Sequence, residues 1–391
     1  MKINRLLLLL LALAALPLTS CIQTGGTTGI SSSSDPGYTS GEPLSPELPV
    51  WSAAETLAAA EEMIDMPTSG IVDVSRADYS YEEMTEDLQT LAVVYDEHFS
   101  YHSIGTSAAG RTLYVGVLGN PDARRQIVVS AAIHGREYMT AQLTMKQLEF
   151  YLRYYDVGSY QGIPYSELFE QICFYIVPMT NPDGVMIAQQ GLESLPEEMR
   201  PLIEECYETE EHDVFVTFET YLSRWKANAN GVDLNRNYDA RWEEYDGADH
   251  PQSYQYKGPS PASEPETQAM VALMDSLPNV IATLCVHSQG EVIYWNCGQG
   301  EDTRSTTRGF AEEVSKRNGY ELIDEQNNDA SLSDWSELER SVPAITVEIG
   351  KGALVLPIEQ FPTVWLQNYD LLPLTAAYFL SIPDEVSTAQ F

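Results

Sequence analysis

The stretch QIVVSAAIHGRE, residues 126–137, joins the pattern that determines the fold to a pattern that suggests chemistry. Its first part, Gln126–Ile133, is an apolar run that predicts a strand buried on both faces. Directly after it, His134 and Glu137 stand three positions apart on a predicted turn. An imidazole and a carboxylate are natural zinc ligands. The same spacing is also typical of a hydrogen-bonded His beside a capping Glu, so the pair alone leaves both interpretations open.

Predicted strands and helices alternate on either side of this stretch. The further strands are Ile172–Met179, Val280–Val286 and Ala344–Ile349, and the helices are Thr140–Tyr155, Pro265–Leu277, Thr306–Arg317 and Pro362–Leu380. The sequence Ser263-Glu264-Pro265-Glu266 has the form of a capping box with an early proline. This order predicts an α/β fold in which helices cover both faces of a mostly parallel or mixed sheet. Sites in such sheets gather at the carboxyl ends of the strands.

The composition excludes several classes of partner. The chain has 391 residues, with 58 acidic and 21 basic side chains and a formal net charge of −37. Nucleic acid is not expected as a partner, because its phosphates require Lys and Arg to replace their counterions. Electrostatic docking on anionic lipid is excluded for the same reason. The length allows one large domain or two of medium size.

The N-terminus predicts export. Residues 1–20 carry two basic residues followed by an apolar run too short to span a bilayer, which is typical of a secretory signal. Leu18-Thr19-Ser20-Cys21 resembles the lipobox of bacterial lipoproteins, in which the Cys is lipidated. That resemblance implies a protein anchored by lipid on Cys21 to the outer side of the cytoplasmic membrane or of another envelope membrane. The alternative is an ordinary cleaved signal with an incidental Cys.

A tether is expected between this segment and the folded domain. Residues 21–75 are rich in Ser, Gly and Pro, and Ile22–Ser75 holds eight acids and no base. A short helix can interrupt the tether at Ala53–Met66. The main domain is expected at residues 76–385, with its folded part beginning near Tyr79, and residues 386–391 are expected to form a tail.

Two more residues complete a candidate zinc site at the predicted strand ends. A catalytic zinc usually has three protein ligands, and His287 is the only other His at the end of a buried strand. Glu348 lies inside an apolar strand, where an ionised carboxylate is costly without a charged partner. It can serve as the base that takes a proton from water, or it can form a salt bridge at the strand end.

A further motif, Gly231–Tyr238, places an Arg between two amides. Asn235 and Arg236 suit the capture of a carboxylate, because the guanidinium fork can donate two parallel hydrogen bonds. A turn held by Asn side chains is the alternative.

Five motifs occur in the order found in zinc metallocarboxypeptidases, and from about Tyr79 to Ile382 the chain resembles that family. They are His134-x-x-Glu137, Asn181-Pro182-Asp183-Gly184, Leu234-Asn235-Arg236-Asn237, His287-Ser288 and Glu348. The resemblance implies an α/β/α sandwich around a mixed, mainly eight-stranded sheet.

The resemblance also implies a role for each residue. His134, Glu137 and His287 would bind one zinc ion, and Glu348 would be the general base and then the acid. Asn235 and Arg236 would hold the free carboxylate of the residue on the leaving side of the scissile bond. The family usually has an Arg after a Trp to stabilise the oxyanion. Lys226 takes that place here, and it supplies the charge without the two-pronged donor.

A second departure concerns a mobile Tyr that digestive carboxypeptidases carry eight residues before an Asp-Trp pair. Asp334-Trp335 is present, but the position eight residues earlier is Gln326. No catalytic Tyr is therefore assigned.

Several stretches resemble the branch of the family that cleaves γ-D-glutamyl-diaminopimelate bonds in bacterial cell-wall peptides. They include Trp225-Lys226-Ala227-Asn228 and the segment from His287 to Trp295. This branch implies muropeptides as substrates. The alternatives are a general zinc carboxypeptidase that trims oligopeptides and, more remotely, a non-catalytic protein that binds wall peptides.

Two features remain open at this level. Apart from Cys21 the chain has four cysteines, which allow three complete disulfide pairings or four buried thiols. The run Gly191–Glu219 holds ten acids and one base. It is expected to be a solvated surface loop. The alternative is a lid over the cleft that selects a substrate carrying an amino group.

Overall fold

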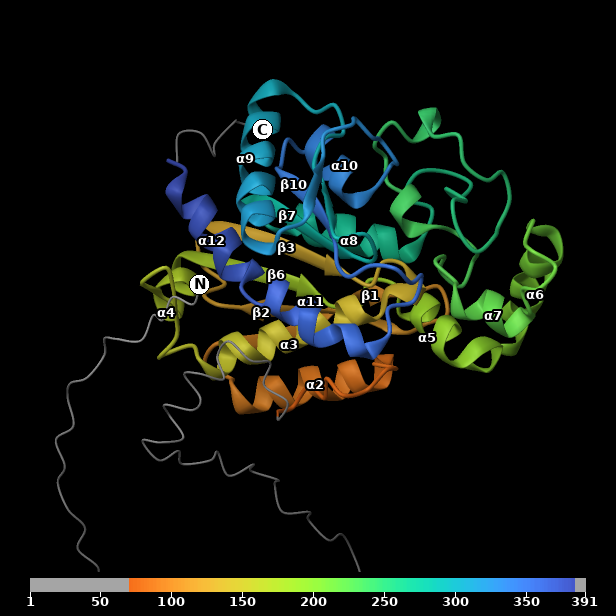
Figure 1. Cartoon of the computed structure of the whole chain (residues 1–391), viewed down its shortest axis with the longest axis horizontal. Coiled ribbons are helices and arrows are strands. Elements are labelled where there is room, and N and C mark those ends of the chain that lie inside the picture. Colours follow the sequence, from red (N-terminus) through yellow and green to blue (C-terminus); the bar gives the residue numbers. More distant parts are fainter. Residues whose placement is uncertain (1–69, 384–391) are drawn as a thin grey trace, which may run out of the picture. The chain divides into compact units, whose positions relative to one another are not determined.

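The computed structural model describes residues 70–383 (Figure 1). The predicted signal segment, Cys21, the helix Ala53–Met66, most of the tether and the tail 386–391 lie outside these residues. Within them, no helix is both long and apolar enough to cross a membrane.

A mixed sheet of eight strands forms the centre of the fold, in the order β1-β2-β6-β3-β7-β10-β8-β9. The strands β6, β3, β7 and β10 are parallel to one another. The pairs β1–β2, β2–β6 and β10–β8 are antiparallel, and β8 and β9 are parallel. The strands are β1 (Phe99–Thr106), β2 (Thr112–Leu118), β3 (Arg125–Ala131), β6 (Ile172–Val177), β7 (Val280–His287), β8 (Val292–Tyr294), β9 (Glu321–Ile323) and β10 (Ala344–Glu348). A small hairpin, β4 (Ser159–Tyr160) and β5 (Ile163–Pro164), stands apart.

Helices cover both faces of the sheet because its central strands are apolar on both sides. In β3, Ile127 and Val129 enter one core and Val128 enters the other. The first core is closed by α2 (Tyr81–Val94), α3 (Met139–Arg153), α4 (Tyr165–Gln171), α9 (Glu301–Asn318), α11 (Phe361–Asn368) and α12 (Leu371–Ser381); the second by α8 (Pro265–Ser276) and α10 (Leu332–Leu338). The predicted α/β/α sandwich is confirmed.

The predicted strands are all present, but two predictions about helices are wrong. The segment predicted as one helix, Pro362–Leu380, forms α11 and α12. Pro373 has no N–H to donate to the carbonyl four residues earlier, so the helix ends and restarts, and Pro373 falls in the first turn of α12.

The capping box at Ser263 is also absent. α8 begins at Pro265 with Glu264 as its N-cap, and no side chain caps it. Ser263 instead accepts from the side chain of Asn237 and donates to Glu264, and Glu266 accepts from the backbone N–H of Ala108 and the side chain of Asn228. Tertiary partners therefore outcompete the local cap.

The folded unit begins before Tyr79, inside the stretch predicted as tether. Val72 and Val74 are buried in the first core. The carboxylate of Glu149 on α3 accepts from the backbone N–H groups of Ile71 and Val72, at 2.9 and 3.1 Å. These two hydrogen bonds to a buried carboxylate attach the short apolar segment to α3.

The acidic run Gly191–Glu219 is not a loop. It is largely helical, with α6 (Arg200–Thr209) at its centre and α7 (Phe218–Ser223) at its end. Ile203 and Cys206 bury the apolar face of α6, which leaves the acids in solvent. The four described cysteines are buried free thiols, so the thiol alternative holds.

Candidate metal centre and active-site cavity

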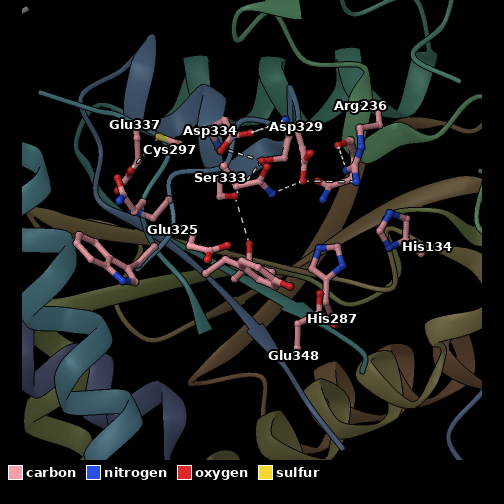
Figure 2. A pocket seen from close by; sticks show the side chains of 18 of the residues that line it. His134, Arg236, His287, Cys297, Glu325, Asp329, Ser333, Asp334, Glu337 and Glu348 are labelled. Carbon is pink, nitrogen blue, oxygen red and sulfur yellow. Dashed lines mark hydrogen bonds and ion pairs between the residues drawn. The ribbon is translucent and has the colours of Figure 1, made fainter. Parts of the chain in front are cut away.

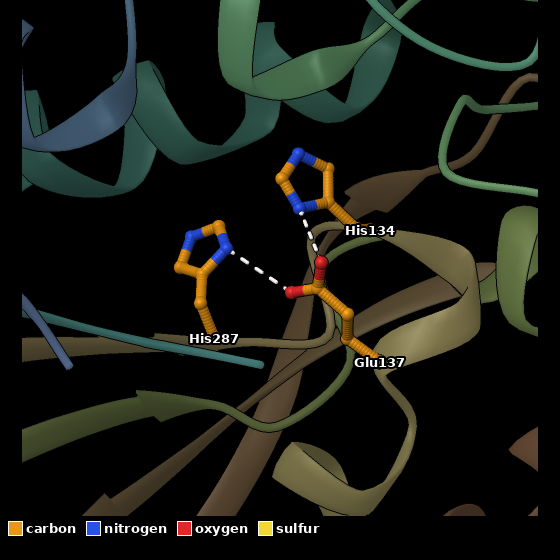
Figure 3. Close-up of side chains that lie close together, drawn as sticks. All are labelled: His134, Glu137 and His287. Carbon is orange, nitrogen blue, oxygen red and sulfur yellow. Dashed lines mark hydrogen bonds and ion pairs between the residues drawn. The ribbon is translucent and has the colours of Figure 1, made fainter. Parts of the chain in front are cut away.

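His134 and Glu137 meet immediately after β3. His134 precedes the short 3-10 turn Gly135–Glu137 (η1), and its Nδ1 lies 2.9 Å from Oε1 of Glu137 (Figure 3). Both side chains are buried. The turn places the two side chains against each other, as the spacing predicted.

His287 reaches the same carboxylate from the end of β7. Its Nδ1 lies 3.1 Å from the second oxygen of Glu137, Oε2 (Figure 3). That oxygen also accepts from the backbone N–H of Ser288 at 3.1 Å. Because β3 and β7 are parallel neighbours, their carboxyl ends bring residues 150 positions apart into contact.

These three side chains fit a zinc ion. One ligand atom from each lies within 4.8 Å of the others, and no other such group of three occurs among residues 70–383. Two imidazole nitrogens and a carboxylate oxygen are a donor set that zinc prefers, and ligand atoms around tetrahedral zinc lie about 3.3 Å apart. The separations of 2.9 and 3.1 Å to Glu137 are close to that value.

Asp233 orients the ring of His134. Its Oδ1 lies 3.2 Å from Nε2 of His134, and its Oδ2 accepts from the backbone N–H of Gln255. Burial would raise the pKa of Asp233, but His134 and Arg236 hold that pKa below its ordinary value. An ionised partner on Nε2 directs Nδ1 toward Glu137, which is the usual arrangement behind a metal-binding His.

The Asn181-Pro182-Asp183-Gly184 motif fixes the backbone next to His134 and at Lys226. Asn181 caps α5 (Pro182–Gln190) and donates to the carbonyls of Ile133, Lys226 and Ala227. A Cβ on Gly135 would meet the backbone of Gly184 at 2.3 Å. Glycine is therefore required where η1 and α5 touch.

Glu348 lies beside His287 because β10 and β7 are parallel and these two residues are paired in register. Burial, and the negative charge of Glu137, raise the pKa of Glu348 to about 7, against the opposing effect of His287. Lys226 stands on the other side, with its Nζ 3.4 Å from Oε1 of Glu137. A proton acceptor and a cation thus flank the three candidate ligands.

Asn235 and Arg236 follow Asp233 in the short turn Leu234–Arg236 (η4). The guanidinium of Arg236 donates to the Tyr245 hydroxyl at 2.9 Å and lies 3.5 Å from Oδ2 of Asp329. Burial would lower the pKa of Arg236, but Asp233 and Asp329 hold it above its ordinary value. Arg236 is thus a permanent cation.

One cavity of about 240 Å³ connects these groups (Figure 2). It is lined by six of the predicted site residues: His134, Lys226, Asn235, Arg236, His287 and Glu348. Glu137 contacts three of them, His134, His287 and Lys226. Cys21 lies outside the described residues.

The sequence analysis missed three residues of this region. Asp233 lies within the Gly231–Tyr238 motif, two positions before Asn235. Its place in that motif could have identified it as a site residue. Tyr294 and Glu325 line the cavity. Neither has a local signal, because only the packing of their segments places them there. No Tyr stands at the position of Gln326, so the assignment of no catalytic Tyr there is unchanged.

A family model described as zinc carboxypeptidase matches residues 84–371, and the chain belongs to the zinc carboxypeptidase family. It is therefore a peptidase of that family, and a non-catalytic binding role is not favoured.

Individual relatives are similar to the chain over most of its length. It is 33% identical over 291 residues to gamma-D-glutamyl-L-diamino acid endopeptidase 1 of Lysinibacillus sphaericus, which covers 73% of this chain and 69% of the relative. It is 25% identical over 319 residues to carboxypeptidase B of Astacus astacus, covering 77% and 96%. Among solved structures, thrombin activatable fibrinolysis inhibitor matches with a TM-score of 0.64 and 17% identity over 81% of this chain and 79% of that one. This last likeness concerns the fold alone.

Proposed function

We propose that the chain is a zinc-dependent peptidase that cleaves an amide bond next to a residue with a free carboxylate. His134, Glu137 and His287 hold one zinc ion. The observation that carries the proposal is the convergence of these three donors with Glu348 and Arg236 on one cavity. When bound, zinc would act as a Lewis acid on the scissile carbonyl and lower the pKa of water.

The side chains of the cavity divide the remaining work. Glu348 accepts a proton from the attacking water and then donates it to the leaving amine. Lys226 places its positive charge beside the ligands, where negative charge develops on the carbonyl oxygen. Asn235 and Arg236 hold the substrate carboxylate, which fixes the scissile bond against the metal end of the cavity.

The substrate we propose is a γ-D-glutamyl-diamino acid bond, as in peptides derived from peptidoglycan. The name of the Lysinibacillus sphaericus relative supports this substrate, and so does the resemblance of the stretches around Lys226 and His287 to that branch of the family. A general zinc carboxypeptidase is the second candidate, since carboxypeptidase B of Astacus astacus matches at 25% identity over 96% of its length.

We further propose that the protein is exported and anchored in an envelope membrane by lipid on Cys21. The sequence of residues 1–21 alone supports this location. A lipid anchor needs no basic patch, so it agrees with a net charge of −37. The full chain and a Cys21→Ala variant are to be compared for incorporation of labelled fatty acid; label in the variant would refute the anchor.

The decisive experiment offers L-Ala-γ-D-Glu-diaminopimelate and ordinary α-linked peptides to the purified protein, with zinc analysis and products identified by mass. We expect one zinc per chain and release of diaminopimelate. Cleavage of the ordinary peptides alone would favour the second candidate. No zinc and no cleavage of either substrate would overturn the mechanism.

A further inference from the structure

The cavity has two ends of different character (Figure 2). His134, His287 and Arg236 lie at one end, and Cys297 and Glu337 lie at the opposite end. The cations that line the cavity are Lys226 and Arg236. Lys226 contacts Glu137 of the candidate metal centre, so both cationic side chains of the lining belong to the metal end. The end away from the metal holds carboxyl groups without a cation from the lining.

Most carboxyl groups of the lining already have partners. Asp329 pairs with Arg236 and accepts from Asn327. Asp334 accepts from the backbone N–H groups of Asp329 and Ser331 and completes the capping box of α10.

Glu337 is occupied as well. It accepts from Thr307, from the backbone N–H of Ala344 and from the thiol of Cys297. Glu348 belongs to the metal end, beside His287. None of these four groups is available for a new ligand at the far end.

Glu325 is the exception. It follows β9 in an exposed segment, lines the cavity, and has no hydrogen bond or ion pair with any residue from 70 to 383. Figure 2 shows it on the same side of the cavity as Cys297 and Glu337, away from His134 and Arg236. An accessible carboxylate with no partner among the described residues, in a cavity whose two lining cations both belong to the metal end, suits a positively charged group of the substrate.

We propose that Glu325 binds the side-chain ammonium group of the residue whose carboxylate is held by Arg236. This inference rests on the proposed function and names the residue that selects a diamino acid over an apolar one. The carboxylate of this substrate residue then lies against Arg236 at one end of the cavity. Its side-chain ammonium lies against Glu325 at the other end.

This assignment replaces the lid considered for residues 191–219. None of the acids in that run lines the cavity, and those of α6 face solvent on another part of the molecule. Selection of an amino group therefore falls to the segment after β9, which carries Glu325.

The test compares two substrates of equal length, L-Ala-γ-D-Glu-L-Lys and L-Ala-γ-D-Glu-L-norleucine, which differ in the side-chain ammonium. The zinc-loaded full chain, Glu325→Gln and the control Asp324→Asn are measured with both. Asp324 is the exposed neighbour of Glu325 and does not line the cavity. We expect Glu325→Gln to lose about tenfold in kcat/KM for the Lys substrate, mainly through KM, as for one charge-assisted hydrogen bond. The norleucine substrate and the control should change less than twofold.

Three results would overturn the proposal. They are an equal loss on both substrates, no preference of the wild-type chain for Lys, and the same loss in Asp324→Asn. If the wild-type chain cleaves neither γ-linked substrate, the proposed substrate class fails first. The same comparison is then made with α-linked peptides ending in Lys or norleucine, where an unchanged Lys preference in Glu325→Gln would refute the role of Glu325.

Discussion

The two ends of the cavity hold buried carboxyl groups that differ in charge. At the metal end, burial would raise the pKa of Glu137, but His134, Lys226 and His287 hold it well below its usual range. At the far end, burial raises the pKa of Glu337 to about 8, and its hydrogen-bond donors, Thr307, Ala344 and Cys297, offset this only in part. The environment of Glu137 therefore favours the ionised carboxylate, whereas that of Glu337 favours the neutral acid near pH 7.

The difference shows that burial alone does not decide whether a carboxyl group is charged. Both side chains are almost completely buried. Glu137 faces cations and imidazoles, whereas the donors around Glu337 are neutral. One sheet edge therefore provides a charged candidate metal centre, while Glu337 in the wall of the same cavity favours the neutral form.

The largest expected effect comes from removing a ligand at the metal end. His134→Ala leaves Glu137 and His287 as the only two ligands, too few for a stable catalytic zinc site. We expect zinc to fall from one per chain to near zero and hydrolysis to be lost. Metal analysis and a peptide assay measure both, with His250→Ala, an exposed His, as the control. Stoichiometric zinc in His134→Ala would show that the ligands have been misassigned.

Glu348→Gln should separate binding of the metal from turnover. The amide keeps the shape of the side chain but cannot accept a proton, so we expect zinc to remain and kcat to fall by about 10²–10⁴-fold or more. Glu359→Gln, an exposed acid, is the control. Hydrolysis at the wild-type rate would remove Glu348 from the mechanism.

Asp233→Asn tests the orientation of His134. The substitution removes the charge that faces Nε2 and leaves the ligands themselves in place. We expect zinc affinity to fall by about 10–100-fold, as for other partners of metal-bound His. Competition with a chelator of known affinity measures this change. An unchanged zinc affinity would mean that packing alone orients the ring.

The smallest effect is expected at the far end, from Glu337→Gln. Because the folded pKa of Glu337 is about 8 and its ordinary value is 4.5, the folded state binds its proton more tightly than the unfolded chain. The stabilisation that comes from this proton is complete below pH 4.5 and is lost as the pH rises toward 8. The expected loss in the free energy of unfolding is on the order of a few kcal/mol.

Urea unfolding at pH 5 and pH 8 measures this contribution. Glu337→Gln should flatten the loss of stability between these two pH values, whereas the exposed Glu339→Gln should not. Equal pH dependence in the wild-type chain and Glu337→Gln would show that Glu337 is ionised in the folded state.

Much of this molecule was predictable from local sequence. The four buried strands followed from apolar runs, and His134, Glu137, His287 and Glu348 followed from polar residues at or beside the ends of those runs. The errors came where tertiary partners won over local signals. The Ser263 hydroxyl accepts from the distant Asn237 in place of capping α8, and α11 and α12 were predicted as one helix across Pro373.

The sequence by itself determined which side chains stand at strand ends, because the alternation of apolar and polar residues is a local property. Only the tertiary structure decided which of them meet. The register of β7 with β10 sets His287 beside Glu348, and the packing of η4 brings Asp233 to His134 across 99 positions. The same packing leaves Glu325 without a partner among residues 70–383, while Glu337 is enclosed. Such pairings depend on the register of strands and the packing of distant segments, which no local pattern encodes.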